Sequence, residues 1–171
     1  VKKILDAKEV LVDGKRRKDH RFMVGLFDVL SIIDGQKHYR VTLDKKGRVV
    51  VIEIPAAESE LKVCKIIGKK VLPKGKVQFN LHDGKNIIFT GQAAVGDSLA
   101  VALPALTVKA VLPLKAGAKV FLMQGKHGGD SGALKSVKGK EATYLSQGKD
   151  IDTAKEYLLV IGEEKAVISI Q

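Results

Sequence analysis

The chain has 171 residues, and its 30 Lys and Arg residues outnumber 19 Asp and Glu residues, which gives a formal net charge of +11. This balance excludes an acidic or neutral surface, and the length suits one average domain or two to three small β modules. The single cysteine, Cys64, excludes an intrachain disulfide and favours a reducing, cytoplasmic compartment.

Turn sequences divide the chain into short apolar runs. Four dipeptides separate runs rich in Val, Ile and Leu, a pattern typical of β-hairpins. They are Asp13-Gly14, Asp34-Gly35, Lys46-Gly47 and Asp83-Gly84. A helix is expected only over residues 2–8, where Ile4 and Leu5 lie among charged residues, and in one turn after Pro55.

The remaining apolar runs predict strands. In chain order these are residues 10–12, 29–33, 39–43, 48–54, 61–67, 77–81, 87–90, 99–103, 107–112, 119–124, 133–137, 142–145, 157–161 and 166–170. Strands at this spacing indicate barrels or sandwiches, so the predicted fold is mainly β. Cys64 is expected to be a small apolar residue on one of these strands.

Soft boundaries near Leu43 and Pro113 divide the chain into residues 1–43, 44–113 and 114–171. The low-charge stretch from Gly91 to Leu112 is expected to form the interior of a central barrel. Its most apolar part, residues 99–108, is interrupted by Pro104 and is too short for the ~18 residues of a membrane span, so no membrane contact is expected.

The basic excess is concentrated in the first half of the chain. It is +4 in residues 1–40, +5 in 41–80, zero in 81–114 and +2 in the remainder. A basic surface raises the local concentration of phosphates. The first half is therefore where a polyanion would be attracted.

Motifs for catalysis are weak. Gly129-Asp130-Ser131-Gly132 is similar to the nucleophile loop of trypsin-like proteases, but no histidine stands in that family's setting, and a turn between strands is expected. Gly148-Lys149 lacks the spacing of a phosphate loop, and the four histidines and Cys64 lack zinc-ligand spacing. We expect no enzyme activity, cofactor, metal or small-molecule substrate.

Residues 15–21 stand out because six of the seven side chains can carry positive charge after the Asp13-Gly14 turn. A solvated charge run is the alternative to a phosphate-binding loop. Further cations follow at Lys45, Lys46 and Arg48, and again at Lys69, Lys70, Lys74 and Lys76. Because aromatic residues make up only 5% and Trp is absent, stacking on single-stranded bases is disfavoured, and double-helical RNA is the expected ligand.

The sequence VKKILDAKEVLVDGKRRKDHRFMVGLFDVLSI resembles the second half of the small RNA-binding fold named after ribosomal protein S-four, a partial α+β module. The resemblance implies that Lys2 and Lys3 lie on a helix and residues 15–21 on a loop that flanks RNA. Later, AGAKVFLMQGKHGGDSGALKSV resembles the KOW motif of SH3-like barrels, with glycines at 125, 129 and 132. That resemblance places Lys126 and His127 at an RNA-facing loop.

The order of these two modules around a β-rich middle is similar to the archaeal and eukaryotic family of small-subunit ribosomal protein four. It implies a structural component of the ribosome whose partners are ribosomal RNA and neighbouring ribosomal proteins. Two alternatives stay open: a KOW-containing transcription or translation factor that binds transiently, and an RNA-modifying enzyme. The residues expected to bind RNA are Lys2, Lys3, Lys15, Arg16, Arg17, Lys18, Arg21, Lys45, Lys46, Arg48, Lys126 and His127.

Overall fold

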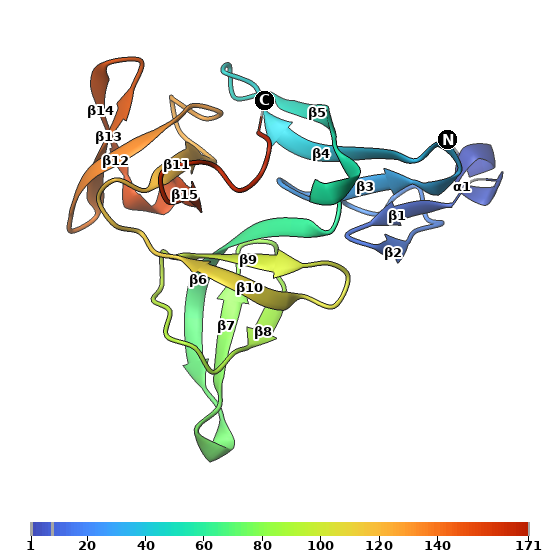
Figure 1. Ribbon diagram of the computed structural model, residues 1–171, viewed down its shortest axis with the longest axis horizontal. Coiled ribbons are helices and arrows are strands. Elements are labelled where there is room, and N and C mark those ends of the chain that lie inside the picture. The colour runs from blue at the N-terminus through green and yellow to red at the C-terminus, as the bar shows by residue number, and fades with distance from the viewer. Residues whose placement is uncertain (1, 8, 171) are drawn as a thin grey trace.

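The computed structural model (Figure 1) describes residues 2–7 and 9–170 and contains three five-stranded antiparallel sheets that follow one another along the chain. The prediction of a mainly β protein is confirmed, since helix within the described residues is limited to α1 and short 3-10 turns. No helix in these ranges is long and apolar enough to cross a bilayer.

The first sheet has the strand order β2-β1-β3-β4-β5. Its elements are α1 (Lys2–Ala7), β1 (Val10–Val12), β2 (Lys15–Arg16), β3 (Val29–Ile32), η1 (Ile33–Gly35), β4 (Lys37–Leu43) and β5 (Val49–Ile54). The helix and the first three predicted turns lie where the sequence placed them. Asp13 and Gly14 both have positive φ, of 50° and 73°, as a tight hairpin turn requires.

The central sheet has the order β10-β9-β6-β7-β8. It comprises η2 (Ala56–Glu58), β6 (Leu61–Val71), η3 (Pro73–Gly75), β7 (Val77–Leu81), β8 (Asn86–Ile88), β9 (Ser98–Ala102) and β10 (Thr107–Leu112). Cys64, Ile66, Phe79 and Leu99 are fully buried in its core, so the structural interpretation of Cys64 is confirmed. β9 is buried as expected, whereas β10 is an edge strand with several exposed residues.

The third sheet has the order β14-β13-β12-β11-β15. Its elements are β11 (Lys119–Leu122), β12 (Ser131–Lys138), β13 (Glu141–Ser146), β14 (Lys149–Ala154), η4 (Lys155–Tyr157) and β15 (Leu158–Gly162). β11 pairs with both β12 and β15, so the last strand returns to the first strand of this sheet. The glycine-rich segment before β12 is a turn, as expected.

One expected strand was wrong, and two strands of the structure were missed. Residues 166–170 form no strand, because their backbone leaves the third sheet and runs to β4, where Arg40 and Thr42 bind the carbonyls of Ser169 and Ile170. β14 was missed because its polar sequence lacks apolar alternation. β2 was missed because its two residues are both cationic.

The first sheet also continues past the expected boundary at residue 43. β5 pairs with β4 over six residue pairs, from His38 opposite Ile54 to Leu43 opposite Val49. The hairpin turn at residues 44–48 keeps this strand with the first sheet. The division of the chain into three domains stays a prediction, and the sheets place the first change near Pro55.

The three sheets meet around one apolar cluster. Phe27 and Leu43 from the first sheet and Val63 from the central sheet pack with the core strands of the third. The rings of Phe27 and Phe121 lie edge to face, with centroids 5.2 Å apart. This shared core fixes the basic loops of different sheets relative to one another.

Candidate nucleic-acid interface

The predicted basic loop begins on β2 and continues over residues 17–21. Lys15, Arg16, Lys18 and Arg21 are exposed, and among the described residues none of them forms an ion pair with a carboxylate. Gly14 supports this geometry, since a Cβ there would lie 2.9 Å from the Cβ of Pro104. The loop therefore presents cations while its first turn packs closely on the central sheet.

Arg17 differs from its neighbours. Its guanidinium carbon lies 4.0 Å from the centroid of the Phe22 ring, and the side chain is half-buried. This cation–π contact contributes about 0.5–1 kcal/mol and orders the loop. Arg17 therefore has a structural role, which its packing on Phe22 provides, whether or not it also binds a phosphate. Arg16 and Arg21 have no such ring contact among the described residues.

Helix α1 lies beside the basic loop. Asp6 of this helix and Lys18, Asp19, His20 and Arg21 line one shallow depression. Lys3 is exposed on the same helix, while the side chain of Lys2 lies outside the described residues. Lys2 and Lys3 lie on a helix, as the S-four resemblance implies, and the structure brings this helix beside the loop.

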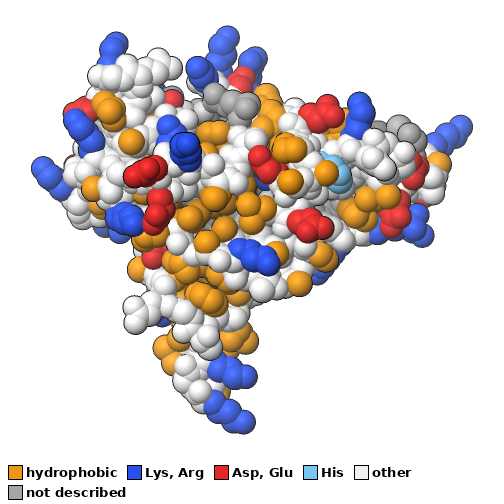
Figure 2. All heavy atoms as spheres, viewed as in Figure 1, with side chains coloured by type: hydrophobic (Ala, Val, Ile, Leu, Met, Phe, Trp, Pro, Cys, Tyr) orange, Lys and Arg blue, Asp and Glu red, His pale blue; other side chains and the backbone are white. Residues whose placement is uncertain are grey.

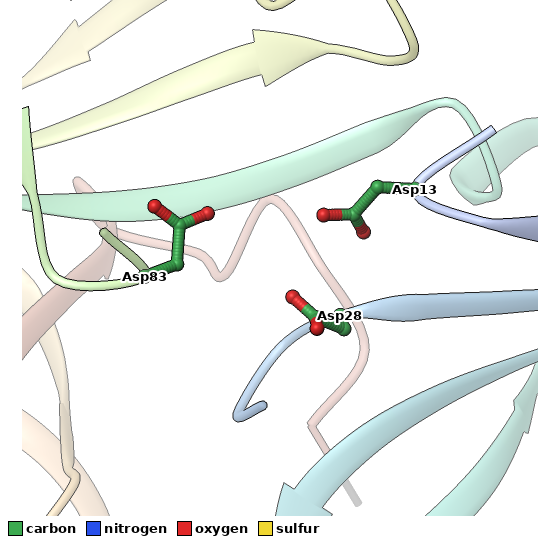
Figure 3. Close-up of side chains that lie close together, drawn as sticks. All are labelled: Asp13, Asp28 and Asp83. Atoms are coloured by element: carbon green, nitrogen blue, oxygen red, sulfur yellow. The ribbon is translucent and has the colours of Figure 1, made fainter. Parts of the chain in front are cut away.

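A buried lysine anchors the base of this loop. Lys62 of β6 is fully buried, and its Nζ donates hydrogen bonds to Asp13 Oδ2 at 2.8 Å, Asp28 Oδ1 at 2.5 Å and Asp83 Oδ2 at 2.8 Å. Asp13 directly follows β1 and Asp28 directly precedes β3 of the first sheet, and Asp83 comes from the β7–β8 turn of the central sheet (Figure 3). We call these four residues the Lys62 cluster.

The close charges shift the pKa values of Asp13, Asp83 and Lys62. Burial is the largest influence on Asp13 and Asp83 and opposes their ionisation, but Lys62, Lys85 and backbone hydrogen bonds together outweigh it and lower the pKa of both carboxyls. Burial also disfavours charged Lys62, yet the Cys64 thiolate formed at high pH and the three carboxylates together raise the pKa of this lysine. Lys62, Asp13 and Asp83 are therefore ionised at neutral pH, and burial raises the pKa of the Cys64 thiol.

The three carboxylates of the Lys62 cluster approach one another as metal ligands do, with oxygen atoms within 4.8 Å. The Lys62 ammonium lies among them and supplies the positive charge that a cation would supply there. Lys85 adds a second ammonium, hydrogen-bonded to Asp13 and 3.2 Å from Asp83. The arrangement is a salt-bridge network that ties the first sheet to the central sheet.

A second basic surface forms where the β4–β5 turn meets the glycine-rich loop before β12. Gly129 has φ of 86°, and a Cβ on it would lie 1.8 Å from the carbonyl oxygen of Asp44. Only glycine permits this approach. As a result Lys45, Lys126 and His127, which are far apart in the sequence, line one pocket.

One carboxylate lines this pocket, and a second lies beside it on the β4–β5 turn. Asp130 lines it and accepts hydrogen bonds from the Tyr144 and Ser146 hydroxyls, each at 3.0 Å, which hold the loop on β13. Asp44 binds Arg48 through Nε at 2.8 Å and through the terminal nitrogen at 2.6 Å. Arg48 is therefore paired with a carboxylate, whereas Lys45 and Lys46 are exposed.

Sequence reasoning missed Lys149, the first residue of β14, which lines the same pocket. The sequence pattern that could have revealed it is the Gly148-Lys149 dipeptide, a turn glycine followed by a cation, which was tested only against the spacing of a phosphate loop.

The charge count also included cations that solvent does not reach. Arg40 is fully buried, and it donates to Glu58 at 2.8 Å and to the carbonyl of Leu61 at 2.9 Å.

The structure thus gathers the predicted cations into two surfaces. One is the basic loop with α1, and the other is the pocket lined by Lys45, Lys126, His127 and Lys149, with Lys46 beside it on the β4–β5 turn. Among the exposed large apolar residues of the described chain, Phe22 is the single aromatic, and Arg17 covers its ring. Such surfaces suit backbone phosphates better than unstacked bases.

Comparison with known proteins points to one family. The model of the ribosomal family S4e matches residues 35–108. The chain is 34% identical to the small ribosomal subunit protein eS4 of Methanocaldococcus jannaschii, over 99% of this chain and 75% of that protein. It is 37% identical to the protein of the same name from Archaeoglobus fulgidus, over 99% and 75% of the two chains.

A solved structure agrees with these relatives. The crystal structure of the 30S ribosomal protein S4e from Thermoplasma acidophilum superposes with a TM-score of 0.84 and 27% identity, covering 95% of this chain and 84% of that one. The similarity therefore includes all three sheets and is not limited to one module.

Proposed function

This chain belongs to the ribosomal family S4e, and we propose that it binds small-subunit ribosomal RNA through the basic loop and the Lys45–Lys126 pocket. As a member of this family it is a structural component of the small ribosomal subunit rather than an enzyme, and its partners are ribosomal RNA and neighbouring ribosomal proteins. Which of its residues touch RNA is the proposal.

The observation that carries the proposal is the pairing state of the cations. Arg16 and Arg21 are exposed on the loop without a carboxylate partner in the described chain, while Arg40 and Lys62 are buried in ion pairs. An unpaired exposed guanidinium binds a phosphate without first losing an internal contact. Each phosphate neutralised also releases condensed counterions, which drives binding at low salt.

Rigidity supports the same proposal. The Lys62 cluster fixes the turn at Asp13 to the central sheet, and the contact of Gly129 with Asp44 fixes the pocket between the first and third sheets. Cations held on rigid elements lose less conformational entropy when they bind. The protein can therefore hold RNA helices in one relative orientation.

The test is a salt titration of binding to small-subunit ribosomal RNA. If about five phosphates are neutralised, a plot of log affinity against log salt has a slope of roughly −3.5 to −4.5. The double variant R16Q/R21Q should bind about 10- to 30-fold more weakly at about 0.15 M salt and reduce the slope by about 1.4 to 1.8. Its unfolding temperature should stay close to that of the wild type, because exposed charges contribute little to stability.

The matched control is K115Q/K135Q, which also removes two positive charges. Lys115 precedes β11 and Lys135 lies on β12, and they are paired with Glu163 at 2.9 Å and Asp150 at 2.7 Å. Its slope should stay unchanged. A wild-type slope near zero, or equal losses in the two variants, contradicts the proposed surface.

A further inference from the structure

The hairpin formed by β6 and β7 extends beyond the sheet to which it belongs. β6 pairs with β9 only over residues 61–65 and with β7 from Ile66 to Val71. β8 pairs with β7 no further than Gln78. The Phe89 amide still donates to the Val77 carbonyl, and beyond it the two strands pair only with each other among the described residues. Figure 1 shows the hairpin projecting from the body of the molecule.

The end of this hairpin carries positive charge without compensation. Residues 67–78 contain Lys69, Lys70, Lys74 and Lys76 and no Asp or Glu. All four lysines are exposed, and none forms an ion pair within the part of the chain that the structure describes. Lysines gather at the projecting end in Figure 2.

The four lysines are not equivalent. Lys69 lies 5.5 Å from the ring centroid of Phe79 and donates to the carbonyl of Ala93, so it is partly engaged. Lys70, Lys74 and Lys76 have no such contact among the described residues. The tip itself turns through Lys74 and Gly75, both with positive φ, of 63° and 70°, which places Lys74 at the end of the hairpin.

The tip is remote from the basic loop. Lys62, which holds Asp13 beneath that loop, and Val71 at the end of β6 are nine residues apart on one strand. At about 3.3 Å per residue, roughly 30 Å of strand separates them. This separation exceeds the Debye length of ~8 Å at physiological salt. The two sets of cations therefore attract anions independently.

We propose that the β6–β7 hairpin tip is a separate RNA-binding surface, through which the protein bridges two segments of ribosomal RNA. This inference rests on the proposed function. Lys70, Lys74 and Lys76 bind backbone phosphates of one segment, while Arg16 and Arg21 bind those of another. Ammonium groups act as point charges and do not select bases. The tip therefore positions RNA by its backbone, independently of sequence.

A narrow projection suits this task. A two-stranded ribbon is only marginally stable alone, and this one leaves Val71 69% exposed at its end. Neutralising the unpaired lysines with phosphates adds favourable interactions and encloses the ribbon. A protein partner for the same tip would instead need carboxylates opposite the lysines, and the test separates these outcomes.

The experiment compares K74Q/K76Q with R16Q/R21Q and with the control K115Q/K135Q in three measurements. The first is affinity for small-subunit ribosomal RNA against salt, the second is a nucleotide-resolution footprint on that RNA, and the third is incorporation into small subunits. We expect K74Q/K76Q to weaken binding about 10- to 30-fold at about 0.15 M salt and to lower the slope by about 1.4 to 1.8. Protection should disappear at nucleotides other than those lost with R16Q/R21Q.

The charge-preserving variant K74R/K76R keeps both positive charges on the same backbone. It should retain the affinity and the footprint, which distinguishes lost charge from a distorted hairpin. If K74Q/K76Q behaves like the control while R16Q/R21Q weakens binding, the hairpin inference is wrong and the proposed function stands. If the wild type itself has no salt-dependent affinity, the proposed function fails first.

Two further results would overturn the inference. Loss of the same nucleotides in both variants would mean that one RNA segment contacts both surfaces. Unchanged RNA affinity with failed incorporation of K74Q/K76Q into small subunits would assign the tip to a protein partner.

Discussion

Replacing Lys62 with methionine removes the ammonium at the centre of the Lys62 cluster while keeping a side chain of similar length. Three hydrogen bonds disappear, to Asp13, Asp28 and Asp83 at 2.5–2.8 Å. The carboxylates then face one another with only Lys85 for compensation, and the side chain of Lys85 is 34% exposed. Removing one partner of a buried ion pair costs about 3–5 kcal/mol.

This cost is a large fraction of the roughly 5–15 kcal/mol by which domains are stable. For a chain of this size it corresponds to a fall of about 6–20 °C in unfolding temperature. Urea unfolding at pH 7, followed by circular dichroism, measures the free energy directly. K115M is the control, because Lys115 is exposed and should cost less than about 1 kcal/mol.

The pH dependence gives the sharper test. In the wild type the lowered pKa values of Asp13 and Asp83 stabilise the fold above their unfolded value of about 4, and this contribution is lost as pH falls through the folded pKa. In K62M burial dominates and raises these pKa values. Stability of the variant should therefore fall as pH rises from 4 to 7, where the wild type is flat or rising.

The refuting results are specific. A loss below about 1 kcal/mol at pH 7, or parallel pH profiles for K62M and the wild type, would mean that the cluster does not couple the two sheets. Adding D28N to K62M removes one of the facing charges and should recover part of the loss. Failure to recover would point to lost packing of the Lys62 stem instead.

Three other predictions follow from particular contacts. G129A should abolish the contact with Asp44 and lower RNA affinity at the pocket, measured by the same binding titration, since a Cβ would lie 1.8 Å from the carbonyl oxygen. R40L should destabilise by about 3 kcal/mol and speed amide exchange in residues 163–170, because Arg40 bridges Glu58 and the last residues. Burial lowers the pKa of His82, so wild-type stability should decrease as pH falls below about 6.5, and H82Q should remove this dependence in urea titrations between pH 7 and 5.

Much of the fold could be read from local chemistry. Asp-Gly and Lys-Gly dipeptides mark turns because aspartate and glycine tolerate positive φ, and apolar runs between them form strands whichever sheet they join. This local logic fails for β14, whose polar residues are held by pairing with β13. It also fails for residues 166–170, whose apolar sequence packs against a distant strand.

The candidate interface was predicted in part. The loop at residues 15–21 is visible in the sequence because its cations are contiguous, but Lys45, Lys126 and Lys149 share a pocket only because Gly129 permits close contact between two sheets. No sequence pattern specifies that contact, since the partner atom is a backbone carbonyl 85 residues away in the chain, on Asp44.

The sequence by itself determined the sign of the charge, its concentration in the first half and the order of the β modules, because these depend on residue identity and near neighbours. Only the tertiary structure decided which cations remain exposed and unpaired, and so able to bind phosphates. Lys62 and Arg16 each count as one positive charge in the sequence. In the structure, Lys62 lies among the carboxylates of residues 13, 28 and 83, whereas Arg16 faces solvent. Burial and pairing are set by long-range contacts, and they determine whether a positive charge stabilises the fold or binds RNA.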